Sequence, residues 1–597
     1  MTIDITGHAT FAAAFTAQVA AQPDRLAVAV TTGSADPAPQ LLSFAELDRR
    51  ARVRARELSA RLSPGARVIL ALPTSVEFVE TYTACLLAGL VAVPVPVPGR
   101  SSHASGRVGS IIQDCSAELV LTLAEEVETL AGWLYGQGLG EVAFEAVAPV
   151  PADADASDWT APVPAATTIG VLQYSSGSTG TPKGVMLSQG NIVANVQALA
   201  DCCELGPEDR FGGWIPMHHD MGLFTQLSAG LLLGLGCVLM PPGEFVKRPI
   251  EWLRVLDAYD VTVSAGPDFA FDLSTRLVTE EQLKTVDLSK LRSVLNGSEP
   301  IHAPTLAAFS ARFAAAGLRP EAVAPGYGLA EATVFVSCKA PAPQPTVLTV
   351  DPAAAERGEL LVAAQGRQIV GCGVPTGLEA RIADPETGRE LPAGRIGELW
   401  LRGPSVGHGY WNRPEQSDAV FNAVLDPAEG EPTSGWLRTG DLCCLIGGEL
   451  FITGRLKEMM VVRGRNLFPQ DLEQEARAAS PALTGFFGAA FAVPAPDERV
   501  VLVHEVAPAT PREELPKVAG AVRQRLSAVL GAPARNVVLV RRGSIRRTTS
   551  GKIQRTAMRD LFLAGELTSV HCELEPAVER LLAEARPAEA VLVGGAA

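Results

Sequence analysis

Ten residues, Ser175-Ser176-Gly177-Ser178-Thr179-Gly180-Thr181-Pro182-Lys183-Gly184, contain three glycines, five hydroxyl side chains and one lysine. They lie between two short apolar runs, Ile169–Tyr174 and Val185–Leu187, which predict strands. Glycines let consecutive backbone N–H groups turn toward an anion, and hydroxyls and a lysine add further donors. The stretch therefore predicts a phosphate-binding loop. It does not match a Walker A loop. That pattern requires Gly-Lys-Ser/Thr at the start of a helix, whereas here the lysine lies between a proline and a glycine. A flexible surface loop is the alternative.

Other strings contain groups that suit a nucleotide. A flat aromatic face, such as that of Tyr327, suits a purine, and a hard carboxylate, such as Glu331, suits Mg²⁺. A carboxylate such as Asp441 can accept two hydrogen bonds from the vicinal hydroxyls of a ribose. Taken alone, Asp441 is also compatible with a turn aspartate that follows a glycine. The strings are Trp214–Leu223, Leu295–Pro300, Gly326–Thr333, Trp436–Leu442, Phe451–Glu473 and Ile545–Arg555.

In their order along the chain, these strings resemble the motifs of the adenylate-forming (ANL) superfamily. That superfamily includes acyl-CoA synthetases, luciferases and nonribosomal-peptide adenylation domains. The resemblance covers roughly residues 10–565. Tyr-Gly-Leu-Ala-Glu-Ala-Thr and Arg-Gly-Arg-Asn-x-x-Pro-Gln-Asp are typical of its fatty acyl-AMP ligase branch. Many relatives have threonine at the position of Ala330, so a phosphate contact through that hydroxyl is not expected here.

The resemblance implies which residues bind ATP. The phosphates are expected at the loop residues Ser175, Ser176, Gly177, Ser178, Thr179, Gly180 and Lys183. The adenine is expected against Gly297, Ser298, Tyr327 and Gly328, with Tyr327 stacked on the base. The ribose is expected at Asp441 and Arg455.

The resemblance also implies the catalytic residues. Lys552 is expected to neutralise the charge that develops between the carboxylate and the α-phosphate. His219 is expected where the acyl carboxylate meets that phosphate, and Glu331 is expected to bind Mg²⁺. Lys457 falls at the hinge position of the family.

The fold class implied is α/β: a large N-terminal domain of α/β subdomains, residues 1–456, and a small mobile α+β lid, residues 457–597. A chain of 597 residues is too long for one core. Local patterns predict a helix over Phe44–Leu62, a strand over Arg67–Ala71 and a helix over Ser75–Leu87. An insertion at about residues 338–368 is expected, and in the fatty acyl-AMP ligases it hinders the movement needed for CoA use.

Composition narrows the possible partners. A net charge of −16 argues against a broad nucleic-acid surface. Met1–Gln22 lacks lysine and arginine, which argues against a secretory signal. The longest apolar runs are shorter than a membrane span, so no stable membrane insertion is expected. Ten scattered cysteines without a C-x-x-C spacing favour buried thiols in the cytoplasm.

The predicted function is ATP-dependent activation of a fatty acid to acyl-adenylate and pyrophosphate. The acyl group is then expected to pass to the phosphopantetheine thiol of an acyl carrier protein. A fatty acyl-CoA ligase and a nonribosomal-peptide-type adenylation enzyme are the alternatives. The apolar residues 223–273 are a candidate lining for a lipid-chain tunnel, which side chains at Gly230 or Gly234 are expected to block.

Overall fold

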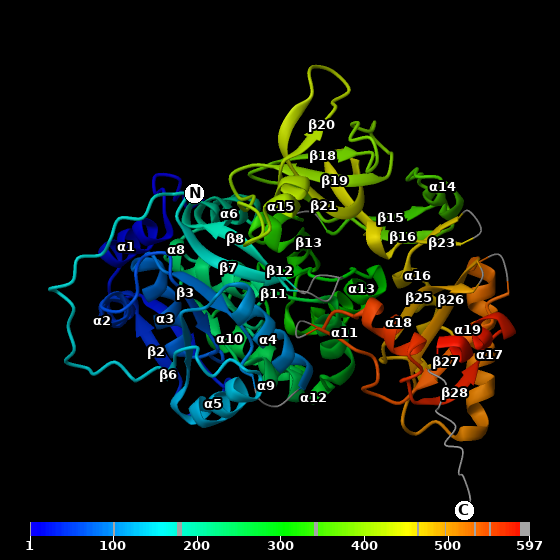
Figure 1. Cartoon of the computed structure of the whole chain (residues 1–597), viewed down its shortest axis with the longest axis horizontal. Helices are drawn as coiled ribbons and strands as arrows, with labels where there is room; N and C mark the ends of the chain where they lie inside the picture. The colour runs from blue at the N-terminus through cyan, green and yellow to red at the C-terminus, as the bar shows by residue number, and fades with distance from the viewer. Residues whose placement is uncertain are drawn as a thin grey trace, which may run out of the picture. The chain divides into compact units, whose positions relative to one another are not determined.

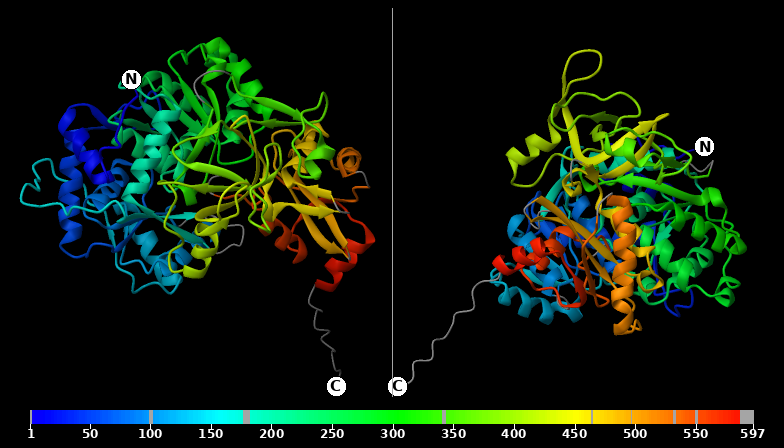
Figure 2. Two further views of the ribbon diagram at one scale, coloured as in Figure 1. Left: turned by 90° about the horizontal axis from the view of Figure 1, so that it is seen from above. Right: turned by 90° about the vertical axis from the view of Figure 1, so that its right-hand side faces the viewer.

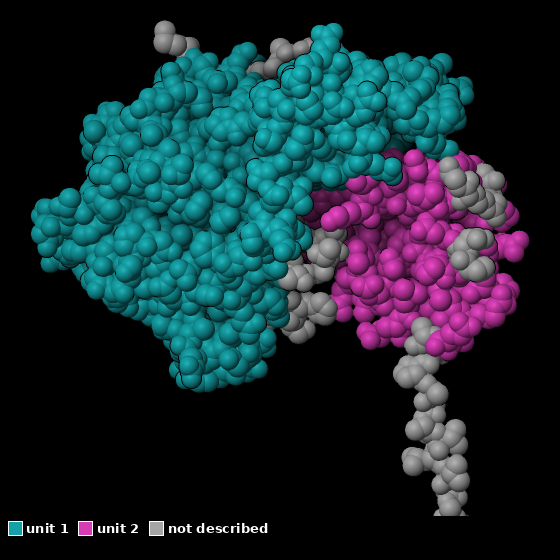
Figure 3. All heavy atoms as spheres, turned by 45° about the horizontal axis from the view of Figure 1, so that its top comes forward, with its two compact units in different colours: residues 1–177, 181–453 teal, residues 178–180, 454–597 magenta. Residues whose placement is uncertain are grey.

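The computed structural model describes residues 2–98, 102–175, 182–339, 344–462, 465–495, 497–530, 533–548 and 551–585. These residues form two compact units, which Figure 3 shows in two colours. Unit 1 contains the described residues up to Thr453, and unit 2 contains those from Gly454 onward. Each unit is described by itself below.

Unit 1 contains one six-stranded sheet built mainly from parallel strands. Its central strands are almost fully buried, which is typical of a parallel sheet covered on both faces. Only the last pair is antiparallel, with Ser175 opposite Lys183. The strand order is β6 (Phe144–Ala146), β5 (Leu119–Thr122), β3 (Arg67–Leu70), β4 (Val91–Pro94), β7 (Ile169–Ser175), β8 (Lys183–Ser188).

A nine-stranded sheet forms the second layer of unit 1. Its central strands are parallel, and β2, β14 and β17 pair antiparallel at its ends. The order is β17 (Val374–Pro375), β14 (Phe335–Cys338), β13 (Val323–Gly328), β12 (Ser293–Asn296), β11 (Val263–Gly266), β9 (Phe211–Gly213), β10 (Cys237–Leu239), β1 (Leu26–Val30), β2 (Gln40–Ser43).

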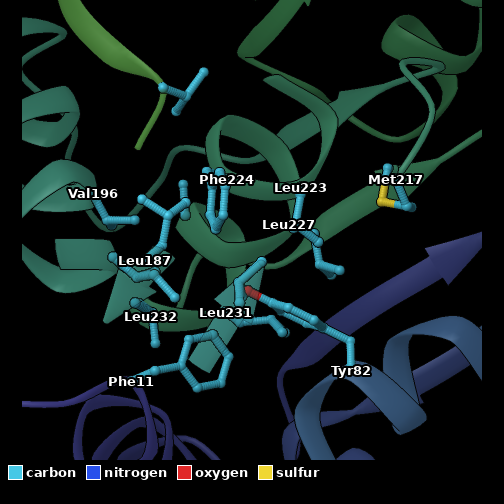
Figure 4. Close-up of a cluster of buried hydrophobic side chains, with 14 of the residues drawn as sticks. Phe11, Tyr82, Leu187, Val196, Met217, Leu223, Phe224, Leu227, Leu231 and Leu232 are labelled. Atoms are coloured by element: carbon cyan, nitrogen blue, oxygen red, sulfur yellow. The ribbon is translucent and has the colours of Figure 1, made fainter. Parts of the chain in front are cut away.

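The two faces of this sheet belong to different apolar cores. Along β10, Cys237 and Leu239 belong to one core, whereas Val238 lies in the other, as the two-residue period of a strand requires. Figure 4 shows part of the first core, where Leu227 and Leu231 lie near Tyr82.

Hydroxyl side chains fix where several helices of unit 1 begin. Ser43, Ser75 and Ser188 each accept a backbone N–H of the first helical turn, which satisfies a donor that the helix itself leaves unpaired. The helices are α1 (Phe11–Ala21), α2 (Phe44–Ser59), α3 (Val76–Leu87), α4 (Ser102–Asp114), α5 (Val127–Gly136), α6 (Gln189–Cys202), α7 (Asp220–Gly222), α8 (Ala229–Leu232), α9 (Pro242–Lys247), α10 (Pro249–Ala258), α11 (Asp268–Leu277), α12 (Glu280–Leu283), α13 (Ala303–Phe313), α14 (Pro352–Glu356), α15 (Pro414–Phe421).

A third sheet completes unit 1. A hairpin of β20 and β21 projects from it (Figures 1 and 2). The strands are β18 (Glu379–Ala383), β19 (Gly397–Arg402), β20 (Ala423–Leu425), β21 (Thr433–Ile446) and β22 (Glu449–Arg455). Within the predicted insertion, β15 (Val347–Val350) pairs with β16 (Arg367–Val370). This hairpin packs its apolar residues on Cys444 and Phe451; residues 340–343 lie outside the described part.

Unit 2 is a sheet covered by helices on both faces. Leu472 of α16 and Val522 of α17 pack in one core with Leu502, whereas Phe562 of α18 and Val578 of α19 pack in the other with Val503. Figure 1 shows these elements in orange and red. The sheet is β25 (Gly488–Ala495), β26 (Asp497–Glu505), β27 (Asn536–Val540), β28 (Ser569–Glu573), beside a hairpin of β23 (Met460–Val462) and β24 (Arg465–Leu467). The helices are α16 (Pro469–Arg477), α17 (Leu515–Leu530), α18 (Arg555–Leu563), α19 (Pro576–Ala585).

None of the helices in the described part of the chain combines the length and the apolar character that a bilayer span requires.

Candidate active site

Three polar side chains from separate segments of unit 1 meet at the start of β8. The ring of Tyr410 lies under the Lys183 ammonium, with Nζ 5.0 Å from the ring centre. The Tyr410 hydroxyl donates to Glu331 Oε1 at 2.8 Å. A cation over an aromatic face and a charge-assisted hydrogen bond are both stabilising contacts. Tyr410 therefore links the predicted phosphate lysine to the predicted magnesium carboxylate.

Backbone pairing holds this arrangement. The chain from residue 407 to 411 runs beside β8, where Met186 N–H donates to Gly409 O at 2.9 Å and Trp411 N–H donates to Gly184 O at 2.8 Å. The Gly407 N–H donates to the carbonyl of Glu331 at 2.9 Å. Tyr410 and Glu331 are thus fixed through main-chain hydrogen bonds as well as through their side chains.

The Tyr410 phenol stays protonated. Its side chain is buried, and this burial, followed by the charge of Glu331, raises the pKa of Tyr410 far above that of a free tyrosine. The hydroxyl can therefore only donate to the carboxylate at physiological pH. The neutral Tyr410 hydroxyl therefore orients one carboxylate oxygen of Glu331.

The predicted adenine and ribose residues also meet. The Tyr327 hydroxyl donates to Asp441 Oδ2 at 2.6 Å, although the two residues are 114 positions apart. Tyr327 lies at the end of β13 and is half-buried, and Asp441 lies within β21 with 4% of its surface exposed. The structure therefore brings together the aromatic ring predicted to contact the adenine and the carboxylate predicted to contact the ribose.

The adjoining glycines are required by close backbone approaches. A Cβ on Gly328 would lie 1.7 Å from the carbonyl oxygen of Val334, and one on Gly297 would lie 3.1 Å from that of Gly326. Ser298 has a positive φ of 70°, a conformation that non-glycine residues seldom adopt. Its hydroxyl contacts the sulfur of Met221 at 3.6 Å. Ser298 thus lies next to α7, the short helix that follows His219.

A strained turn follows Glu331. Thr333 has φ 68° and ψ −63°, and Val334 N–H donates to Ala332 O at 2.9 Å across it. This is the rare γ-turn with a positive φ. The Thr333 hydroxyl donates to Ser405 O at 2.7 Å and the side chain is fully buried. Strain of this kind is found at functional sites, where surrounding contacts maintain it.

His219 lies at the start of an unusual helix. Its Nδ1 accepts the Met221 N–H at 3.2 Å and lies 2.7 Å from Asp220 Oδ1. The helix continues as a π-helical segment, η2 (Leu223–Ser228), before it becomes α8. π-Helical turns occur frequently at functional sites. The preceding residue, His218, is neutral, because burial above all lowers its pKa to about 3.

The π-helical segment contains an unsatisfied amide. Gln226 has 1% of its surface exposed, and among the described residues neither its Oε1 nor its Nε2 has a hydrogen-bond partner. The amide packs over Gly213 of β9, where an added Cβ would lie 2.4 Å from Nε2. A buried amide without partners is destabilising.

Side chains at Gly230 or Gly234 would meet atoms of the fold itself. A Cβ on Gly230 would lie 2.8 Å from the carbonyl oxygen of Gly236, and one on Gly234 would lie 1.8 Å from Gln22 Nε2. Gly234 also has a φ of +68°. Both glycines serve the packing of the fold, and the tunnel itself stays a prediction.

Unit 2 holds the predicted lysine and hinge. Lys552 lies in a short hairpin in which its carbonyl accepts Thr548 N–H at 2.8 Å and its own N–H donates to Thr548 Oγ1 at 3.0 Å. Arg555 follows the hairpin and pairs with Glu473 at 2.7 Å and with Glu458 at 2.7 Å. Glu458 directly follows Lys457, so this buried ion group joins the lysine hairpin to the hinge segment.

The remaining predicted residues are placed as follows. Ser175 ends β7, but Ser176, Gly177, Ser178, Thr179 and Gly180 lie outside the described residues. Arg455 and Lys457 are exposed residues of unit 2. Their roles, like those of Lys552 and His219, stay predictions.

The sequence strings did not predict the role of Tyr410 or the strain at Thr333. Tyr410 lies in the stretch Gly409–Glu415. Its separation from Glu331 along the sequence does not predict that the two side chains touch. Tyr174 was likewise missed: its hydroxyl donates to Asp114 Oδ2 at 2.6 Å, and Arg413 donates to the other oxygen at 2.6 Å. This trio anchors the residue just before Ser175.

The family model of AMP-binding enzymes matches residues 15–411 of the chain. The chain belongs to the AMP-binding enzyme family. It is 36% identical over 543 residues to JamA, the medium-chain-fatty-acid–[acyl-carrier-protein] ligase of Moorena producens, with 88% of this chain and 90% of that protein covered. It is also 36% identical over 572 residues to FadD32, a long-chain-fatty-acid–AMP ligase of Mycolicibacterium smegmatis, with 89% and 90% covered.

Solved structures agree with these relatives. A structure from studies of the fatty acyl-adenylate ligases of E. coli and L. pneumophila superposes with a TM-score of 0.84 and 29% identity. It covers 95% of this AMP-binding enzyme and 100% of that chain. The predicted adenylate-forming α/β fold and the predicted resemblance to the fatty acyl-AMP ligases are therefore confirmed.

Proposed function

We propose that this AMP-binding enzyme joins a fatty acid to AMP and passes the acyl group to the phosphopantetheine thiol of an acyl carrier protein. The proposal is carried by the similarity, along nearly nine tenths of both chains, to an enzyme named as a fatty-acid–carrier-protein ligase. The paired contacts of Lys183 with Tyr410 and of Tyr327 with Asp441 support an ATP site in unit 1.

In this proposal, ATP is held by the groups described above. Lys183 and the loop from Ser175 bind the β- and γ-phosphates, and Asp441 accepts hydrogen bonds from the ribose. The Tyr327 ring stacks on the adenine while its hydroxyl stays on Asp441. The turns at Gly297 and Gly328 allow the base to approach the backbone closely.

Glu331 suits a magnesium ion that arrives with ATP. No group of three or more His, Cys, Asp or Glu side chains that could hold a metal occurs among the described residues. Mg²⁺ usually binds one or two protein carboxylates and completes its shell with phosphates and waters. The single carboxylate of Glu331, which Tyr410 orients, matches this mode of Mg²⁺ binding. When bound, the ion supplies positive charge to the phosphates.

In the reaction, a carboxylate oxygen of the fatty acid attacks the α-phosphorus and the bond to pyrophosphate breaks. This chemistry depends mainly on positioning and on charge stabilisation. We assign the positioning of the carboxylate to His219 and its neighbour Asp220. We assign the neutralisation of the reacting oxygens to Lys552, delivered by a lid that turns about Lys457. We place the enzyme in the cytoplasm, where ATP and carrier proteins are available.

The test supplies purified enzyme with ATP, Mg²⁺ and fatty acids of several lengths. Exchange of labelled pyrophosphate into ATP measures the first step. The second step is measured in parallel with a phosphopantetheinylated carrier protein and with free CoA. We expect exchange with at least one fatty acid and thioester formation on the carrier protein alone.

Two outcomes separate the alternatives. Efficient acyl-CoA formation would favour a fatty acyl-CoA ligase, a name that a relative from Mycobacterium tuberculosis carries at 35% identity over 551 residues. Exchange that depends on an amino acid would favour a nonribosomal-peptide-type enzyme. A lack of exchange with every carboxylic acid would contradict the proposed adenylation itself.

A further inference from the structure

Three thiols of unit 1 lie against one another, one strand away from the residues assigned to the nucleotide. Cys202 ends α6, Cys203 follows it, and Cys338 ends β14. The Cys202 and Cys338 sulfurs are 3.2 Å apart, and the Cys203 and Cys338 sulfurs are 3.7 Å apart. A disulfide bond is about 2.05 Å long. The nearer pair therefore needs only about 1 Å of approach to bond.

The backbone around these thiols is already held in place. Asn195 of α6 donates through Nδ2 to the carbonyls of Ala332 and Phe335, at 3.0 and 2.8 Å, and accepts Phe335 N–H at 3.1 Å. The carbonyl of Cys338 lies 3.3 Å from the Cys202 sulfur. Helix α6 and strand β14 are thus clamped together at a second point seven residues before Cys202. The two sulfurs meet without movement of a loop.

The three thiols differ in reactivity. Cys202 is half-buried, whereas Cys203 and Cys338 are 2% and 1% exposed. Hydrogen bonds from Cys203 and Cys338 lower the pKa of Cys202 well below that of an ordinary thiol, whereas the hydrogen bonds of Cys338 with Cys202 and Cys203, together with burial, raise the pKa of Cys338. An exposed thiolate is the nucleophile in thiol oxidation. Cys202 is therefore the sulfur that an oxidant reaches first, with Cys338 beside it as a proton-bearing partner.

We propose that Cys202 and Cys338 are a redox modification site, at which a peroxide converts two thiols into one reversible disulfide. The Cys202 thiolate attacks one peroxide oxygen, the O–O bond breaks, and Cys202 becomes a sulfenic acid while hydroxide leaves. The Cys338 sulfur then attacks the Cys202 sulfur, the S–O bond breaks, and its proton leaves with the oxygen as water. In sum, two thiols and one hydrogen peroxide give one disulfide and two waters.

The bond would join distant parts of unit 1. Its ends are 136 positions apart in the chain, and a cross-link that closes so long a loop restricts the unfolded chain strongly. It would also tie β14 to α6 beside β13, because Cys338 lies opposite Gly326 and Ser337 lies opposite Tyr327. This inference does not depend on the proposed function, because thiol chemistry can be measured without a substrate.

The experiment uses the full chain, reduced and then freed of reductant. The protein is treated with hydrogen peroxide, unfolded, alkylated and digested without reduction. We expect loss of two of the ten thiols, one cross-linked peptide pair that contains Cys338, full reversal by dithiothreitol, and a higher midpoint of thermal unfolding in the oxidised form. Because Cys202 and Cys203 share one peptide, variants must identify the partner. The cross-link should vanish in Cys202→Ser and persist in the matched control Cys203→Ser.

Other results would overturn the inference. These are an unchanged thiol count, a cross-link that persists in Cys202→Ser, irreversible oxidation of Cys202 to a sulfinic acid, or an intermolecular disulfide through the exposed Cys572. If Cys202→Ser fails to fold, Cys203→Ser still decides, because a Cys338 cross-link to this peptide can form only through Cys202 in that variant. A Cys572→Ser background removes the intermolecular reaction from every arm.

Discussion

Tyr410 joins two charged side chains that the proposed reaction uses in different ways. Its ring contacts the Lys183 ammonium and its hydroxyl orients the Glu331 carboxylate. Without this ring, the lysine and the carboxylate could pair with each other directly, and neither would then face a phosphate. Tyr410 is therefore a positioning residue for both, and its two contacts can be removed one at a time.

Tyr410→Phe removes the hydroxyl and keeps the ring. A hydrogen bond to a charged group is worth about 1.5–3 kcal/mol, so we expect pyrophosphate exchange to slow by about ten- to a hundredfold and to need more Mg²⁺ for saturation. Exchange at graded Mg²⁺ concentrations measures both effects. Tyr410→Leu, which also removes the ring, should in addition raise the KM for ATP. A Tyr410→Phe enzyme with unchanged exchange would show that the hydroxyl has no positioning role.

Lys552→Ala tests the proposed neutralising charge. Loss of one electrostatic contact to a transition state commonly costs about 10²–10³ in rate, and we expect that loss in acyl-AMP formation. The unfolding midpoint should stay unchanged, because Lys552 lies half-buried in a short hairpin. Lys517→Ala, at an exposed lysine of α17 in the same unit, is the matched control. Turnover equal to the wild type would remove Lys552 from the mechanism.

Among the elements, the π-helical segment η2 and the γ-turn at Thr333 depart from regular structure. Each lies a few residues after a predicted site residue: η2 follows His219 and the short helix α7, and Thr333 follows Glu331 and Ala332. Regular geometry would be more stable at both places. The fold supports these departures by hydrogen bonds such as that from the Thr333 hydroxyl to Ser405. The Gln226 side chain, in contrast, has no hydrogen-bond partner in the described part of the chain.

Gln226→Met is therefore expected to stabilise the protein. Methionine has a similar shape and buries no unpaired amide, so the free energy of unfolding should rise by about 1 kcal/mol or more. Gln197→Met is the matched control. Gln197 is also buried, but its Oε1 accepts Ile5 N–H at 2.8 Å, so the same substitution there should destabilise. Urea unfolding compares the two. Equal destabilisation would mean that Gln226 has a bound partner in solution.

At the scale of the molecule, the two units have separate apolar cores and separate buried titratable groups. His504 in β26 of unit 2 is fully buried, and burial above all lowers its pKa to about 4. Arg477 contributes in the same direction, whereas Glu473 and the Glu505 carbonyl oppose it. The folded pKa lies below the ordinary value of about 6.5, so the unfolded chain takes up the proton first as the pH falls.

Stability is accordingly expected to fall with acidification between about pH 6.5 and pH 4. From pH 7 to pH 5, His504 should account for a loss of about 2 kcal/mol. Urea unfolding of the wild type and of His504→Gln at both pH values measures the difference. The variant should lose less stability on acidification than the wild type. An identical loss in both proteins would show that His504 does not carry this pH dependence.

Local sequence predicted many elements closely. The helix predicted over Phe44–Leu62 spans Phe44–Ser59, and the strand predicted over Arg67–Ala71 spans Arg67–Leu70. Both are fixed by short-range patterns, an apolar stripe with a serine cap in one and a continuous apolar run in the other. The π-helical segment was not predicted, because its i to i+5 pairing depends on what packs around it.

Short motifs were enough to predict the family, the α/β fold class and the candidate residues. The glycines, prolines and hydroxyls within each motif specify its local backbone geometry. Contacts between the motifs became visible only in the folded chain. Tyr327 meets Asp441 across 114 positions, and Cys202 meets Cys338 across 136. Such contacts depend on strand order and on the packing of helices against sheets. The spacing of residues within one motif therefore does not predict them.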